Sequence, residues 1–135
     1  MLSDCTVFAR DLVNERADEM HPARLEEVAR ALAAEAGAAV HVLAGEALLP
    51  AGLHMLHAVG QAARHAPRYV ELLHAGDPAN PKDVIMLVGK GITYDTGGLN
   101  IKPTGSMEDM HMDMVEFLRA RAGGVAGPGR VPAWG

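Results

Sequence analysis

Residues 88 to 114 read VGKGITYDTGGLNIKPTGSMEDMHMDM, and this stretch decides which fold we expect for the chain. It is rich in glycine and carries two lysines and two aspartates: Lys90, Asp95, Lys102 and Asp113. The apolar residues 84–88 that lead into it favour a β-strand. Open α/β sheets place ligand sites at the carboxyl ends of their strands, so a strand ending at Val88 would deliver Lys90 to such an edge.

Lys90 and Asp95 are candidate metal ligands. A lysine binds a metal only as the neutral amine, which requires a nearby dication and partial burial. Asp95 offers a hard carboxylate, and the Thr96-Gly97-Gly98 sequence lets the backbone turn so that this carboxylate can bridge two ions. A single loop aspartate is more often a solvated carboxylate. The joint spacing of the two lysines and two aspartates favours a metal site instead.

The stretch resembles the signature of the leucyl aminopeptidases, a cytosolic family of two-metal exopeptidases, in residue types and in spacing. The resemblance implies that Lys90, Asp95 and Asp113 are three of the side chains that bind two Mn or Zn ions, with Asp95 touching both. It implies that Lys102 is catalytic: this lysine stays charged and polarises the scissile carbonyl as a metal-activated water attacks. Met110 falls where the family lines the pocket for the substrate's first side chain.

The resemblance has further implications for substrates and partners. It implies peptide substrates with bulky aliphatic N-terminal residues, assembly as a homo-hexamer, and a bicarbonate ion that acts as general base. Weaker agreement extends upstream through four short segments, residues 9–14, 20–22, 60–61 and 67–70. The resemblance thus covers about residues 8–114 and implies a partial aminopeptidase catalytic domain.

The family's second metal-binding stretch, Asp-x-Glu-Gly-Arg, does not occur in the 135 residues. It would supply two more carboxylates and the arginine that holds bicarbonate. We therefore expect a fragment of a metalloaminopeptidase that is inactive as an isolated chain. The alternative is a catalytically inactive remnant, or a fragment of the same fold that docks onto full-length subunits. Some relatives double as DNA-binding proteins, but the acidic charge of this chain argues against that reading.

Composition favours one α/β domain that binds neither nucleic acid nor membranes. The chain is 49% hydrophobic, yet only five residues are aromatic, which suits helices packed on a sheet better than an all-β barrel. A net charge of −5 without a Lys/Arg run disfavours nucleic acid. No apolar run reaches the roughly 18 residues that span a bilayer. Asp4 stands where a secretion signal would become apolar, and Cys5 is the only cysteine, so we expect a cytoplasmic protein.

Hydrophobic periodicity predicts helices that alternate with strands. Helices are expected over residues 6–15, 22–37 and 53–59, and strands over residues 38–44, 69–74 and 84–88. This alternation predicts a mixed, largely parallel sheet flanked by helices.

The sequence divides at residue 114. Residues 1–114 are expected to form the N-terminal half of the catalytic domain, and residues 115–135 a divergent tail. Within this tail, residues 116–122 could still be helical, whereas residues 123–135 are rich in Gly, Pro and Ala and are expected to be disordered. The departure from the family after Asp113 indicates a truncation or a shifted reading frame, with a lineage-specific surface tail as the alternative.

Other sites fit the sequence less well. A phosphate-binding loop requires Ser or Thr directly after its lysine, where this chain has Gly91. His54 and His57 could face a metal together, but no third ligand lies near them in the sequence. His111 lies close enough to the proposed site in the sequence to support its ligands, but it is expected at the surface. The methionines of the decisive stretch are expected to line the pocket and fill the core: Met107, Met110, Met112 and Met114.

Overall fold

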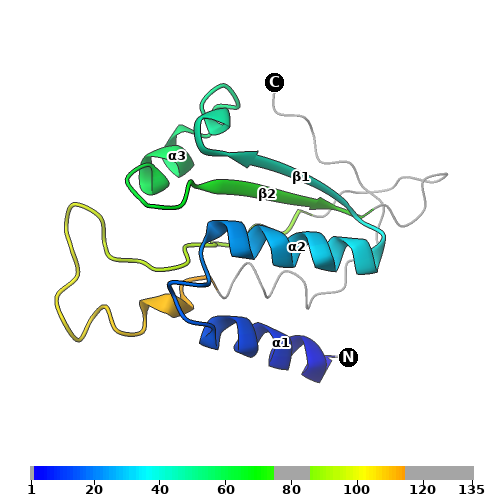
Figure 1. Ribbon diagram of the computed structural model, residues 1–135, viewed down its shortest axis with the longest axis horizontal. Helices are drawn as coiled ribbons and strands as arrows, with labels where there is room; N and C mark the ends of the chain where they lie inside the picture. The colour runs from blue at the N-terminus through cyan, green and yellow to red at the C-terminus, as the bar shows by residue number, and fades with distance from the viewer. Residues whose placement is uncertain (1, 75–85, 115–135) are drawn as a thin grey trace. The chain divides into compact units, whose positions relative to one another are not determined.

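The computed structural model of the chain describes residues 2–74 and 86–114 (Figure 1). These residues form two compact units. The first unit comprises residues 2–22 and 87–114, and the second comprises residues 23–74 with Met86. All of the residues singled out above as metal ligands, catalytic lysine or pocket lining belong to the first unit.

Helix α2 (Pro22–Ala36) confirms the helix predicted over residues 22–37. Pro22 suits the first helical position, because the N–H that it lacks has no partner there. Gly37 ends the helix with a φ of +64°, which lets the Ala38 N–H donate to the Ala33 carbonyl at 2.8 Å. The apolar residues repeat at helical spacing and are buried: Leu25, Val28, Ala29 and Ala33.

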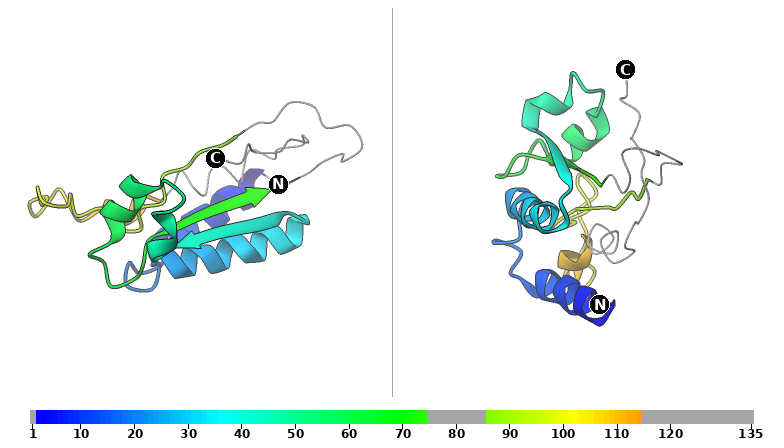
Figure 2. Two further views of the ribbon diagram at one scale, coloured as in Figure 1. Left: turned by 90° about the horizontal axis from the view of Figure 1, so that it is seen from above. Right: turned by 90° about the vertical axis from the view of Figure 1, so that its right-hand side faces the viewer.

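The second unit contains a two-stranded antiparallel sheet that α2 accompanies along its length (Figures 1 and 2). Strands β1 (Ala39–Ala44) and β2 (Arg68–Leu73) pair in antiparallel fashion, from Ala39 opposite Leu73 to Ala44 opposite Arg68. The short helix η1 (Gly45–Leu48) and helix α3 (His54–Gly60) connect them. These elements confirm two of the predicted strands and the helix predicted over residues 53–59.

The described sheet differs from the predicted one. It has two antiparallel strands, so a largely parallel sheet is not confirmed within residues 2–74 and 86–114. The strand predicted over residues 84–88 is wrong for residues 86–88, which adopt no regular structure and leave Val88 85% exposed. An apolar run becomes a strand only when a neighbouring strand pairs with its backbone, and no described strand pairs with this one. Residues 84 and 85 lie outside the described ranges.

The first unit holds helix α1 (Leu2–Asn14) and the short helix η2 (Met110–Met112), which contact each other. Helix α1 begins before the helix predicted over residues 6–15, and Asp4 in its first turn favours that start through the helix dipole. Leu12, Met20 and Met114 are the buried apolar side chains of this unit. None of the described helices combines the length and the apolar character needed to cross a bilayer. The tail predicted over residues 115–135 lies outside the described ranges.

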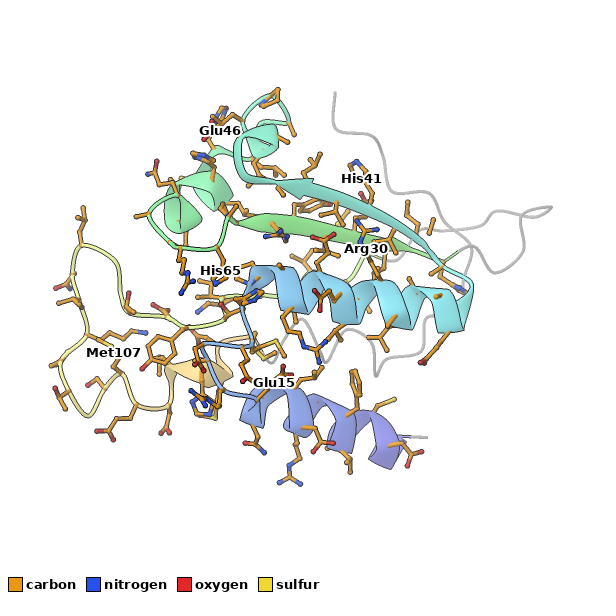
Figure 3. The ribbon with its side chains drawn as sticks, viewed as in Figure 1. Glu15, Arg30, His41, Glu46, His65 and Met107 are labelled. Atoms are coloured by element: carbon orange, nitrogen blue, oxygen red, sulfur yellow. The ribbon has the colours of Figure 1, made fainter. Side chains whose placement is uncertain are left out.

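One charged network joins α2 to the two-stranded sheet. The Glu26 carboxylate accepts hydrogen bonds from Arg30 Nε at 2.8 Å and from Arg68 Nε, on β2, at 2.6 Å; Arg30 is labelled in Figure 3. The Glu26 side chain is only 18% exposed. Burial alone would raise the pKa of Glu26, but the hydrogen bonds from Arg30 and Arg68 outweigh burial and lower it. The network therefore fixes the helix against the sheet with charge-assisted bonds.

Glu26→Ala should lower the free energy of unfolding by about 1.5–3 kcal/mol, the range for hydrogen bonds to charged groups. The matched control is Glu27→Ala, one residue further along the same helix. Glu27 is 66% exposed and meets Arg24 at 3.5 Å, so its loss should cost at most about 0.5 kcal/mol. Both substitutions change helix propensity equally. Urea unfolding of the two variants and the parent chain measures the difference.

The effect of Glu26 should depend on pH. Its pKa is lower in the folded chain, so its contribution is complete above the unfolded value of about 4.3 and is lost as the pH falls through the folded value. The stability gap between the parent and Glu26→Ala should therefore close in acid. Equal losses for the Glu26 and Glu27 variants at neutral pH would contradict the role given to the network.

Candidate functional site

The candidate site lies on an irregular loop that backbone hydrogen bonds fold back on itself. The Lys102 N–H donates to the Thr96 carbonyl at 2.9 Å, and the Asp95 N–H donates to the Met110 carbonyl at 3.4 Å. The Tyr94 hydroxyl donates to the carbonyl of Met107 at 3.2 Å; Met107 is labelled in Figure 3. These bonds bring Asp95 next to residues that follow it by 7 and by 15 positions.

Gly97 makes the turn after Asp95 possible. Its φ is +90°, and a Cβ at this position would lie 2.5 Å from the Asn100 carbonyl oxygen and 3.2 Å from the Lys102 nitrogen. No larger residue fits there without moving the backbone. The Gly97 N–H donates to Asp95 Oδ1 at 2.8 Å, which leaves Oδ2 to face the lysines. The glycine therefore sets both the turn and the direction of the carboxylate.

The structure brings together the two lysines and two aspartates predicted from the sequence. Lys90 Nζ lies 2.6 Å from Asp113 Oδ2 and 3.4 Å from Asp95 Oδ2. Lys102 Nζ lies 3.2 Å from Asp95 Oδ2. We call these four residues the four-residue cluster. Their side chains are between 24% and 42% exposed, so the cluster is partly buried but water can still reach it.

The charges of the cluster stabilise one another. The backbone N–H of Gly97 is the largest influence on Asp95 and, with the Lys102 ammonium, holds the pKa of this carboxyl well below its usual range. The hydrogen bond to Asp113 is the largest influence on Lys90 and, with Asp95, raises the pKa of the amine despite partial burial. Asp95 therefore stays an anion and Lys90 a cation over a wide pH range.

The donor chemistry of the cluster suits a cation. Two carboxylates converge on Lys90 Nζ, so a positive charge is already held between them, and carboxylates are the ligands that hard divalent ions prefer. Lys90 itself is held as an ammonium and would join as a ligand only after losing a proton. The described residues contain no group of three or more His, Cys, Asp or Glu side chains that could hold a metal ion.

The histidine pair considered from the sequence forms no such group among the described residues. His57 Nε2 instead lies 3.2 Å from Glu46 Oε1, and Glu46 extends from η1 (Figure 3). His111, which was expected at the surface, is half-buried, and its Nδ1 lies 3.4 Å from the Glu108 carbonyl.

A contact that the sequence did not predict joins Lys102 to Met110. Lys102 Nζ donates to Met110 Sδ at 2.9 Å while it also faces Asp95. Met110 was expected only to line a pocket. Nothing in the spacing of eight residues indicates the contact, because it depends on how the loop folds back through η2. The other methionines of the stretch differ in burial: Met112 is 44% exposed, whereas Met114 is fully buried.

Gly97→Ala should disrupt the site, and Gly98→Ala provides the matched control. Gly98 also has a positive φ, of +72°, but a Cβ there meets nothing within 4 Å. Alanine at 98 should cost only the roughly 1–2 kcal/mol of left-handed backbone strain. Alanine at 97 adds the clash with Asn100 and Lys102. Amide hydrogen exchange should show loss of protection at the Lys102 N–H in Gly97→Ala alone; equal protection in both variants would contradict this account.

Known proteins resemble this chain in sequence and in structure. A probable cytosol aminopeptidase of Mycobacterium leprae is 46% identical over 117 residues, which cover 84% of this chain and 22% of the relative. The leucyl aminopeptidase of Trypanosoma brucei, solved in complex with actinonin, matches 90% of this chain and 24% of its own with a TM-score of 0.83 at 34% identity. The bottromycin maturation enzyme BotP, solved in complex with Mn, matches 90% of this chain and 26% of its own with a TM-score of 0.75 at 38% identity.

The chain thus spans about one fifth of the length of the M. leprae relative. Over that part the likeness to aminopeptidases is consistent in sequence and in fold, which confirms the resemblance predicted from residues 8–114. Residues 7–116 match the family model for the catalytic domain of the cytosol aminopeptidase family. The chain therefore belongs to the cytosol aminopeptidase family.

Proposed function

We propose that this chain carries part of the active site of a leucyl-aminopeptidase-like metalloenzyme, which hydrolyses N-terminal residues from peptides. The four-residue cluster is the observation that supports the proposal most directly. It places two carboxylates around the Lys90 ammonium, and the Lys102 ammonium 3.2 Å from Asp95. Family membership supplies the reaction class, because the matched relatives are named aminopeptidases.

Asp95, Asp113 and Lys90 would hold two divalent ions, Mn or Zn. The complex of the related BotP with Mn supports a divalent metal. Such ions, when bound, supply an activated water as nucleophile at neutral pH. Asp95 uses Oδ1 for the Gly97 N–H and presents Oδ2 to the cations. Lys90 would give up its proton as it changes from counterion to ligand.

Lys102 would act on the substrate rather than on the metal. Its ammonium is fixed between Asp95 and Met110, at the border of the proposed metal site. A fixed positive charge there polarises the scissile carbonyl and stabilises the oxyanion that develops on it. Met110, half-buried beside Lys102, would form part of the wall that receives the first side chain of the peptide.

The remaining features belong to the proposal for the whole enzyme. They are a bicarbonate ion as general base, a homo-hexameric assembly, a cytoplasmic location and a larger, largely parallel sheet to which strands β1 and β2 contribute. The name cytosol aminopeptidase of the relatives supports the location.

A rival proposal is an inactive remnant, or a fragment that docks onto full-length subunits of the same fold. One observation favours it: the Lys90 ammonium already lies against both carboxylates that a metal ion would need. We therefore expect the 135-residue chain alone to hydrolyse leucyl amides no faster than the metal ions do.

A chimera tests the proposed roles. In it, residues 8–114 replace the matching region of the M. leprae relative. Lys102→Ala in this chimera should lower kcat by about 100- to 1,000-fold, the usual loss for one donor to an oxyanion, with metal content unchanged. Asp95→Ala should lose metal and turnover together. Asp109→Ala removes an exposed carboxylate of the same loop and should change neither.

Metal analysis beside the kinetics separates the roles. Equal metal loss in the Lys102 and Asp95 variants would show that Lys102 is a ligand, contrary to the proposal. A folded chimera that binds metal but has no turnover would favour the rival, an inactive remnant.

A further inference from the structure

Lys102 is held by two acceptors of unequal strength. Its ammonium lies 2.9 Å from Met110 Sδ and 3.2 Å from Asp95 Oδ2. A thioether sulfur is a weak acceptor, whereas a carboxylate is a strong one. Any change that makes residue 110 a better acceptor would therefore draw the ammonium away from Asp95. Met110 is half-buried, so small solutes can reach it.

We propose that Met110 is an oxidation site through which peroxide controls the position of Lys102. One peroxide oxygen is transferred to Sδ: an S–O bond forms, the O–O bond breaks, and the other oxygen leaves as water. Sulfur is oxidised by two electrons and peroxide is reduced. The product, methionine sulfoxide, presents a polar oxygen at the place where Lys102 already donates. Methionine sulfoxide reductases return the sulfur to the thioether.

The neighbouring methionines provide internal controls. Met112 lies on the same short helix and is 44% exposed, but none of the described hydrogen bonds involves its sulfur. Peroxide should oxidise it at least as fast as Met110, without consequence for Lys102. Met114 is fully buried and should resist oxidation in the folded chain. Of the three, only Met110 couples its oxidation state to a lysine.

The consequence for turnover rests on the proposed function, in which Lys102 must face the substrate carbonyl. Oxidation would hold the ammonium on residue 110 and reduce its hold on the developing oxyanion. The coupling between Met110 and Lys102 does not depend on that function. It can be measured in the 135-residue chain, without metal or substrate.

The experiment follows the reactivity of the Lys102 amine. The chain is treated with hydrogen peroxide and then briefly with acetic anhydride, and peptide mass mapping reports sulfoxide at each methionine and acetylation at Lys102. A lysine-containing peptide in the same tube normalises the reagent. Oxidation should slow acetylation of Lys102 about fivefold, the factor that one net hydrogen bond supplies. Reduction by methionine sulfoxide reductase should restore the original rate.

Two variants assign the effect. Met110→Leu keeps the volume of the side chain but removes the sulfur, so peroxide should no longer change acetylation of Lys102. Met112→Leu should leave the full response. Circular dichroism before and after oxidation confirms that the chain stays folded.

The proposal is overturned if acetylation of Lys102 stays constant while Met110 is fully converted, or if the response persists in Met110→Leu. It is also overturned if Met110 stays reduced at a peroxide dose that converts Met112 completely. An inactive chimera with an intact peroxide response at Lys102 would instead count against the proposed function alone.

Discussion

The attraction between the Lys90 ammonium and the carboxylates of Asp95 and Asp113 is the interaction on which the candidate site depends. Two like charges a few ångströms apart repel by about 4 kcal/mol at the effective dielectric of a protein surface. A cation between them attracts both carboxylates, so the total electrostatic energy of the three groups becomes favourable. Because Asp113 follows Lys90 by 23 positions, this attraction also closes a long loop and decides which residues meet. The arrangement is thus already that of a cation site, with an internal amine as its cation.

Local signals in the sequence were sufficient to predict most of the helices and strands of the second unit. Pro22 and Gly37 bound α2 because each acts on the backbone next to it, and the apolar repeat between them needs no distant partner to be recognised. The prediction of a strand over residues 84–88 was wrong for residues 86–88 for the opposite reason. Its apolar run has the composition of a strand, but pairing depends on residues far away in the chain, and composition carries no information about them.

The candidate site likewise has features that the sequence predicts and features that depend on how distant residues come together. The identities of the four cluster residues followed from their spacing and from a family resemblance, and the structure brings them within hydrogen-bond distance. Which lysine faces which carboxylate did not follow, since that depends on the direction of Asp95 Oδ2 after the Gly97 turn. The pairing of Lys102 with Met110 was equally out of reach, because a thioether beside an ammonium has no pattern in sequence.

The exposed apolar residues that precede the loop affect how the chain behaves in concentrated solution. Leu87 is 48% exposed and Val88 is 85% exposed, and neither belongs to a strand. An apolar segment that pairs with none of the described strands can act as a template for pairing with another chain of the same kind. We expect such a polypeptide to precipitate as its concentration rises and to be captured by chaperones that hold unfolded segments.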